Sequence, residues 1–140
     1  MALDPKPVAR SAVETTHIVL PGNTNALGTI FGGTVMQWID EIAAVAAIRH
    51  AAGTVVTAAV DALQFLQPIH LGELVVLRAQ VNAVFRSSME VGVRVEVEEP
   101  KTGVRRKTTK AYLTFVALDR AGGCPREVPP LLLLTDEDRR

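Results

Sequence analysis

The sequence is short of groups that build disulfides or metal sites. Cys124 is the one cysteine in 140 residues, so neither an intramolecular disulfide nor a multi-cysteine metal site can form. It lies in a Gly-Gly-Cys-Pro loop, which favours an incidental thiol over a nucleophile. The three histidines, His17, His50 and His70, are not spaced as metal ligands. We therefore expect no metal site.

The sequence also lacks a charge excess and a long apolar run. Acidic and basic residues number 15 each, so the charge balance does not support a nucleic-acid or anionic-membrane partner. The longest aliphatic run, at 131–134, is far shorter than the ~20 residues of a membrane-spanning helix. Residues 1–14 lack the apolar stretch of a signal peptide. A cytoplasmic location is the default expectation.

What the chain does contain is a globular composition, with 48% hydrophobic and 21% charged residues. A chain of this size buries roughly two-thirds of its unfolded surface, which is enough for one core. We expect a single domain over residues 1–140. Its first ten residues would form a loose arm, and the stretch 122–140 would form a tail that docks only in part.

One helix is predicted over residues 33–51. Its apolar residues recur at helical spacing, and Gly53 is placed to end it. His50 lies near its C-terminus, where a cation would interact favourably with the helix dipole. The apolar stripe consists of Val35, Trp38, Ile39, Ile42 and Ala46.

The rest of the chain is predicted to form strands. These cover residues 11–20, 54–66, 73–84, 87–98 and 104–118, with a hairpin turn at 99–103. Strand 87–98 alternates between valines or methionine and charged residues, as in a half-buried antiparallel strand. The fold class is therefore α+β, with one long helix against one antiparallel sheet. Such a sheet leaves an edge strand and an apolar flank uncovered, so we expect self-association.

The junction at residues 22–41 is the candidate reaction site. Backbone N–H groups at a helix start have no intrahelical partner, and Gly32 and Gly33 carry no Cβ that would keep a ligand oxygen away. Such amides can form an oxyanion hole, in which one donor lowers a barrier by ~3 kcal/mol. The alternative is that the Gly-Gly pair only lets the chain turn into the helix.

Asp40 and Asn25 each allow two interpretations. Asp40 shares a helix side with Thr34, Gln37 and Glu41, which favours a solvated face. Met36 and three nearby alanines could instead make a pocket floor that raises the pKa of the acid. Asn25 suits turn chemistry, or an amide that orients a water or a carbonyl.

Four ordered sequence blocks resemble the acyl-CoA hydrolase family of hotdog-fold thioesterases, over about residues 12 to 130. The blocks are Asn25–Glu41 with its Gly-Gly pair, Val56–Asp61 with Phe65, Pro68 and Gly72, Arg86–Val91, and Thr114–Asp119. The resemblance implies a hotdog fold, in which a five- or six-stranded antiparallel sheet wraps a central helix. It also implies double-hotdog dimers, often assembled as trimers of dimers, with active sites between subunits.

The resemblance also implies roles for individual residues. Asn25 and Asp40 match the catalytic residues and would face each other across the dimer. The coenzyme A contacts would fall on two strand blocks. These are Ala58, Ala59 and Val60, and Ser87, Ser88 and Met89. Some relatives have histidine where this chain has Phe31, so no side-chain role is carried over there.

The implied activity is hydrolysis of the thioester of fatty acyl-CoA. Asp40 would activate water or attack directly, Gly32 and Gly33 amides would hold the oxyanion, and Asn25 would orient water or carbonyl. No cofactor is expected, because coenzyme A is part of substrate and product. The basic cluster at 105–107 could contact coenzyme A phosphates or form a solvated strand end. The alternative function is a non-catalytic, acyl-CoA-binding regulatory protein with the same fold.

Overall fold

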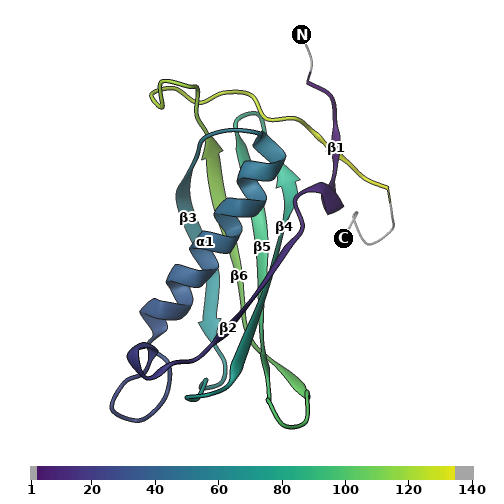
Figure 1. The fold of residues 1–140 in the computed structure, drawn as a ribbon. Helices are drawn as coiled ribbons and strands as arrows, with labels where there is room; N and C mark the ends of the chain where they lie inside the picture. Colours follow the sequence, from purple (N-terminus) through teal and green to yellow (C-terminus); the bar gives the residue numbers. More distant parts are fainter. Residues whose placement is uncertain (1–2, 135–140) are drawn as a thin grey trace.

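A computed structural model describes residues 3–134 and shows one long helix lying across one face of an antiparallel sheet (Figure 1). The sheet order is β2-β4-β5-β6-β3, so β2 and β3 are its edges. This confirms the predicted hotdog architecture. The main elements are α1 (Gly32–Ala51), β2 (Val13–Ile18), β3 (Val55–Phe65), β4 (Leu74–Val84), β5 (Ser88–Glu98) and β6 (Arg105–Ala117).

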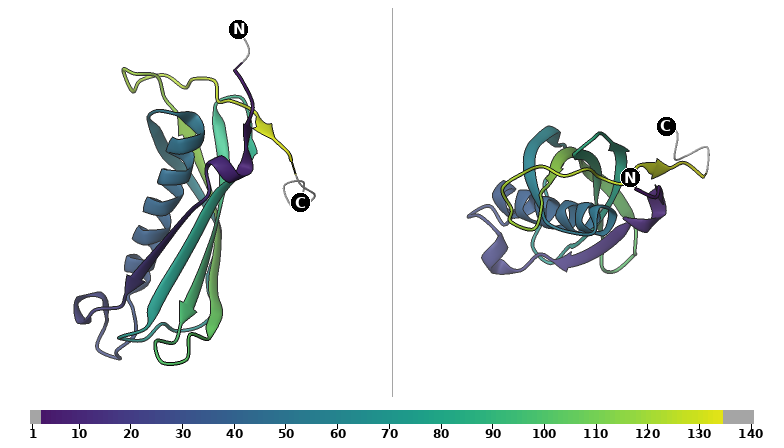
Figure 2. Two further views of the ribbon diagram at one scale, coloured as in Figure 1. Left: turned by 45° about the vertical axis from the view of Figure 1, so that its right-hand side comes forward. Right: turned by 90° about the horizontal axis from the view of Figure 1, so that it is seen from above.

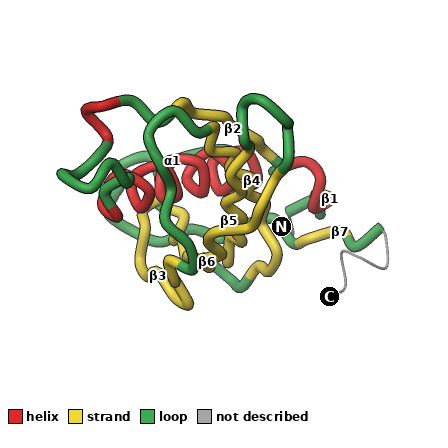
Figure 3. Tube along the Cα trace, turned by 90° about the horizontal axis from the view of Figure 1, so that it is seen from below, coloured by secondary structure: helices red, strands yellow, loops and turns green. Residues whose placement is uncertain are grey.

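The sheet curves around α1, as views along the strands show (Figures 2 and 3). The predicted stripe packs into the concave face: Val35, Ile39, Ile42 and Ala46 are buried. Trp38, which is half-buried, stacks instead on His17 of edge strand β2, with ring centroids 4.2 Å apart. The five inward residues of β5, from Met89 to Val97, are all buried, which confirms the predicted alternation.

The helix ends at Ala51, as predicted, but the predicted stop signal does not form its cap. Ala52, not Gly53, takes the left-handed conformation (φ 57°), and its N–H donates to the Ile48 carbonyl at 2.7 Å. Gly53 allows a close approach instead: a Cβ there would lie 2.6 Å from Nη2 of Arg126. That nitrogen donates to the Ala51 carbonyl at 2.7 Å, so it caps the helix.

The N-terminal arm is docked rather than loose, which corrects the sequence-based expectation. Strand β1 (Lys6–Pro7) pairs in parallel with β7 (Leu131–Leu132), and Val8 is buried. The two ends of the described chain meet near the end of α1 (Figure 1), where the last helix carbonyls can accept hydrogen bonds from cations. Lys6 Nζ donates to the His50 carbonyl at 2.9 Å.

His50 is not the cation expected at the end of α1. Its side chain is fully buried, and its Nε2 lies 2.6 Å from the Pro129 carbonyl in the tail. Burial lowers the pKa of His50 below 6.5, so the ring is neutral at pH 7. Lys6 and Arg126 supply the positive charge at this end.

Two short 3-10 helices, η1 (Val8–Arg10) and η2 (Pro21–Asn23), complete the described elements. The tail docks through buried Val128 and continues to residue 134. The remainder of the predicted tail, 135–140, lies outside the described residues. Within residues 3–134, no helix combines the length and apolarity that a membrane span requires.

Candidate functional site

The start of α1 lies beside open space at Gly33 but not at Gly32. The preceding residue, Phe31, contributes no side-chain cap, although its carbonyl accepts from Thr34 and Val35 N–H. A Cβ on Gly33 would meet nothing within 4 Å, whereas one on Gly32 would lie 3.5 Å from the Phe65 ring. The two glycines therefore differ: Gly33 is open, and Gly32 is shielded by β3.

Asp40 forms a hydrogen bond with the facing edge strand. Thr57 Oγ1 of β3 donates to Asp40 Oδ1 at 2.7 Å. Asp40 is exposed in the single chain, as periodicity favoured. The pocket floor of alanines is wrong in part, because Ala43 and Ala47 face the core and only Met36 of that group lies beside Asp40 in a cleft.

That cleft lies between α1 and β3 and holds about 330 Å³. It brings together Gly33, Asp40 and Thr57. The helix rises about 1.5 Å per residue with 3.6 residues per turn, so Gly33 and Asp40 lie nearly two turns apart on one face. The remaining walls are mostly apolar and consist of Met36, Gln37, Ile39, Val60, Leu63 and Leu113.

Thr57 was missed as a site residue by sequence reasoning. Thr57 shares the inward face of β3 with Val55, because these two residues pair with the buried Phe115 and Ala117 of β6. The available signal was a polar side chain two residues after Val55, within the apolar first half of the strand.

Asn25 does not line this cleft. Its Oδ1 accepts from the N–H groups of Leu27 (2.9 Å) and Thr29 (3.3 Å), and its Nδ2 donates to Thr29 Oγ1 at 3.0 Å. The turn role is thus confirmed. Leu27 in the same loop is 86% exposed.

The expected coenzyme A blocks lie on two strands separated by β6. Ser88 is in register with Val116, which is in register with Val56 beside Ala58. Ala58 and Ala59 are exposed, and Val60 lines the cleft. Met89 differs from the expectation: its side chain is fully buried, so it can offer a ligand only its backbone.

Two of the three basic residues at 105–107 are engaged in ion pairs. Arg105 Nε lies 2.9 Å from Glu98, and Arg106 forms a two-pronged pair with Glu73 at 2.8 and 3.1 Å. The hydrogen bond from Arg106 holds the pKa of the Glu73 carboxyl below its usual value. In this structure Arg105 connects the start of β6 to the end of β5, and Arg106 connects β6 to the turn before β4.

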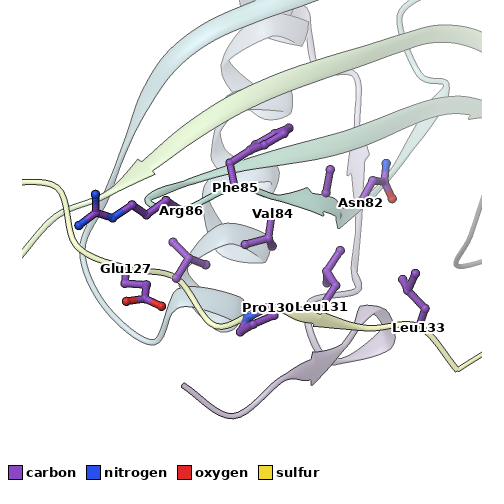
Figure 4. A pocket seen from close by; sticks show the side chains of 10 residues that line it. Asn82, Val84, Phe85, Arg86, Glu127, Pro130, Leu131 and Leu133 are labelled. Atoms are coloured by element: carbon purple, nitrogen blue, oxygen red, sulfur yellow. The ribbon is translucent and has the colours of Figure 1, made fainter. Parts of the chain in front are cut away.

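A second hollow of about 680 Å³ lies at the end of β4, beneath the tail (Figure 4). Phe85, Arg86 and Glu127 line it, together with apolar tail residues such as Leu131. None of the proposed catalytic residues lies in its walls. Among residues 3–134 there is also no cluster of His, Cys, Asp and Glu suited to a metal ion.

The family model of the thioesterase superfamily matches residues 27–104, a region that includes both glycines and every residue of the cleft except Leu113. The chain belongs to the thioesterase superfamily. An uncharacterized acyl-CoA thioester hydrolase of Bacillus subtilis is 43% identical over 91% of this chain and 74% of its own length. Relatives from mouse are longer, and this thioesterase-superfamily chain spans only 19% to 36% of them.

Solved structures agree with this assignment. The thioesterase-superfamily fold of this chain matches an apo-hexameric acyl-CoA thioesterase with a TM-score of 0.93 and 44% identity, over 99% of this chain and 88% of that one. It matches an acyl-CoA hydrolase of Staphylococcus aureus, in complex with butyryl-coenzyme A and coenzyme A, with a TM-score of 0.89 and 39% identity, over 96% and 81%.

That Staphylococcus aureus enzyme has also been solved as three variants, in which an Asn, an Asp and a Thr are each replaced by alanine. The replaced positions lie 15 and 17 residues apart. Asn25, Asp40 and Thr57 have the same spacing here.

Proposed function

We propose that this protein hydrolyses acyl-CoA thioesters to a free acid and coenzyme A in the cleft between α1 and β3. The observation that carries the proposal is the joint placement of Asp40, its hydrogen-bonded Thr57 and the unobstructed Gly33 at the helix start in one apolar cleft. The similarity to the acyl-CoA hydrolases of Bacillus subtilis and Staphylococcus aureus supports the same chemistry.

The reaction needs an activated water, an oxyanion donor and little assistance to the leaving thiol. A thiol has a pKa near 8.5, so it departs as thiolate without a strong general acid. Asp40 acts as a general base toward water, an effect worth ~10²–10⁴ in rate, or attacks the carbonyl directly. The Gly33 amide holds the developing oxyanion, and Gly32, behind the Phe65 ring, is the weaker candidate.

Asn25 reaches the reaction from a second copy of the chain. Within one chain its loop does not line the cleft. Strand β3 is a sheet edge with exposed Val56 and Val60, which suits pairing with another copy. Hexameric relatives support such an assembly, in which three dimers combine into a hexamer. The shared spacing with the varied residues of the Staphylococcus aureus enzyme supports the participation of Asn25, Asp40 and Thr57.

Coenzyme A contacts the exposed backbone and small side chains of Ala58, Ala59 and Val60. The hydroxyls of Ser88 on β5 and of Ser87 just before it are further contacts, across β6 from β3. The location is cytoplasmic, where acyl-CoA substrates and a reduced Cys124 are expected.

The test is to supply acyl-CoAs of two to sixteen carbons and follow release of free thiol. We expect thiol release with at least one chain length, and Asp40→Asn should abolish most of it while melting like the wild type. Saturable binding without release at any chain length would favour the alternative, a non-catalytic acyl-CoA-binding regulatory protein. Release unaffected by Asp40→Asn would remove this residue from the mechanism.

A further inference from the structure

Ala62 has a backbone conformation that is unusual for a residue inside a strand. Among the described residues, only Ala52 and Ala62 are non-glycine residues with positive φ. Ala52 ends the helix, where the left-handed conformation is common. Ala62 (φ 54°) lies inside edge strand β3, where that conformation costs an L-residue stability. Such strain persists where it positions something useful.

The strain at Ala62 belongs to a β-bulge. Asp61 pairs with Tyr112, and the next paired residue of β3, Gln64, faces Lys110. Three steps along β3 therefore correspond to two steps along β6, and β3 carries one extra residue. Bulges of this kind are frequent beside active sites, where they redirect a side chain.

The redirected side chain is that of Leu63. Val60 and its partner Leu113 both face the cleft, so strict alternation would place Ala62 at the next inward position. Because of the extra residue, Leu63 lines the cleft instead, and Ala62 does not. The bulge thus replaces a methyl group with an isobutyl group in the cleft wall.

We propose that Leu63, held inward by the Ala62 bulge, determines which acyl chain lengths the enzyme accepts. The side chain narrows the apolar part of the 330 Å³ cleft opposite Met36 and Ile39. Acyl chains that end before Leu63 bind without displacing it, and longer chains collide with it. The inference rests on the proposed hydrolysis of acyl-CoA and names its substrate class as the shorter acyl-CoAs.

The experiment compares kcat/KM for butanoyl-CoA and hexadecanoyl-CoA in the assembled protein. Leu63→Ala should raise the ratio of long-chain to short-chain kcat/KM about tenfold or more, since a pocket that gains or loses methylene-sized space changes discrimination by 10–200-fold. Leu63→Phe should lower the ratio. Phenylalanine is larger than leucine and leaves no cavity, so this variant keeps the test available if Leu63→Ala fails to fold.

Two control variants separate specificity from general damage. Val104→Ala removes apolar volume from an exposed turn and should leave the ratio unchanged. In the Ala62→Gly variant, glycine adopts the same φ without strain, so Leu63 stays inward. This variant should also preserve the ratio of long-chain to short-chain kcat/KM.

The outcomes distinguish the two proposals. A ratio that shifts in opposite directions for Leu63→Ala and Leu63→Phe supports the inference. Thiol release by the wild type with an unchanged ratio in both folded variants overturns the inference and leaves the proposed function standing. Absence of thiol release by the wild type, with any acyl-CoA, overturns the proposed function and the inference together.

Discussion

Replacing Thr57 by valine removes the hydroxyl that holds Asp40 and keeps the shape of the side chain. Thr57 Oγ1 donates to Asp40 Oδ1 at 2.7 Å, across the gap between β3 and α1. A hydrogen bond to a charged group contributes about 1.5–3 kcal/mol. If all of it orients Asp40 for the reaction, and each 1.36 kcal/mol is tenfold in rate, kcat should fall between about tenfold and 150-fold.

The assay is steady-state thiol release with the best acyl-CoA substrate. KM should stay within about twofold, because Thr57 acts through Asp40 rather than on the substrate. Thr57→Ser is the matched control, since it retains the hydroxyl, and it should keep most of the wild-type kcat. Thermal melting of both variants checks that the fold is intact.

Two results would refute this reasoning. A folded Thr57→Val protein with wild-type kcat would show that the hydrogen bond to Asp40 has no part in the reaction. A Thr57→Ser protein as impaired as Thr57→Val would mean that the site depends on the γ-methyl group, not on the hydroxyl.

Three further predictions concern stability, each read from urea unfolding midpoints. Ala52→Gly should stabilise the protein by about 0.5–1 kcal/mol, because glycine adopts the left-handed helix end without strain; a lower midpoint would contradict this. Arg106→Met should destabilise by about 1–2 kcal/mol, since the half-buried Glu73 loses its two-pronged partner, and equal stability would mean that the pair contributes nothing. Burial lowers the pKa of His50, so below pH 6.5 the unfolded chain binds a proton at this residue more readily than the folded protein does. The free energy of unfolding should therefore fall with pH, by at most about 1.4 kcal/mol per pH unit. His50→Gln should flatten this slope.

The fold was readable from the sequence because its signals are local. The alternation that begins at Met89 and the helical stripe around Ile39 each report burial within one element. Hairpin-length connections, such as the turn that ends with Gly103 at φ 72°, then required neighbouring strands to be antiparallel.

The docked arm and the residues that cap the end of the helix were not readable, because both depend on contacts between distant segments. Lys6 reaches the carbonyl of a residue 44 positions away, and Arg126 reaches one 75 positions away. Neither residue shows this partner in its local pattern. Gly53 was assigned the role of helix stop by its type, whereas its actual neighbour is the Arg126 guanidinium.

The candidate site was readable in part. Spacing located Gly33 and Asp40 on one helix but favoured a solvated face for the acid, and the family resemblance was needed to place Asp40 in a reaction. Thr57 and the inward turn of Leu63 depend on the register and bulges of β3. Periodicity cannot place such bulges, because one extra residue reverses the face of every later side chain.

The most direct test of the account is whether Asn25 and Asp40 act on one thioester from two subunits. Asn25→Ala and Asp40→Asn chains, each expected to be inactive alone, are unfolded together in equal amounts and refolded, with different tags to verify mixed assemblies. In a symmetric dimer half the dimers are mixed and each has one intact site, so about a quarter of wild-type activity should return. Mixed assemblies with no activity above that of the separate variants would contradict the shared site.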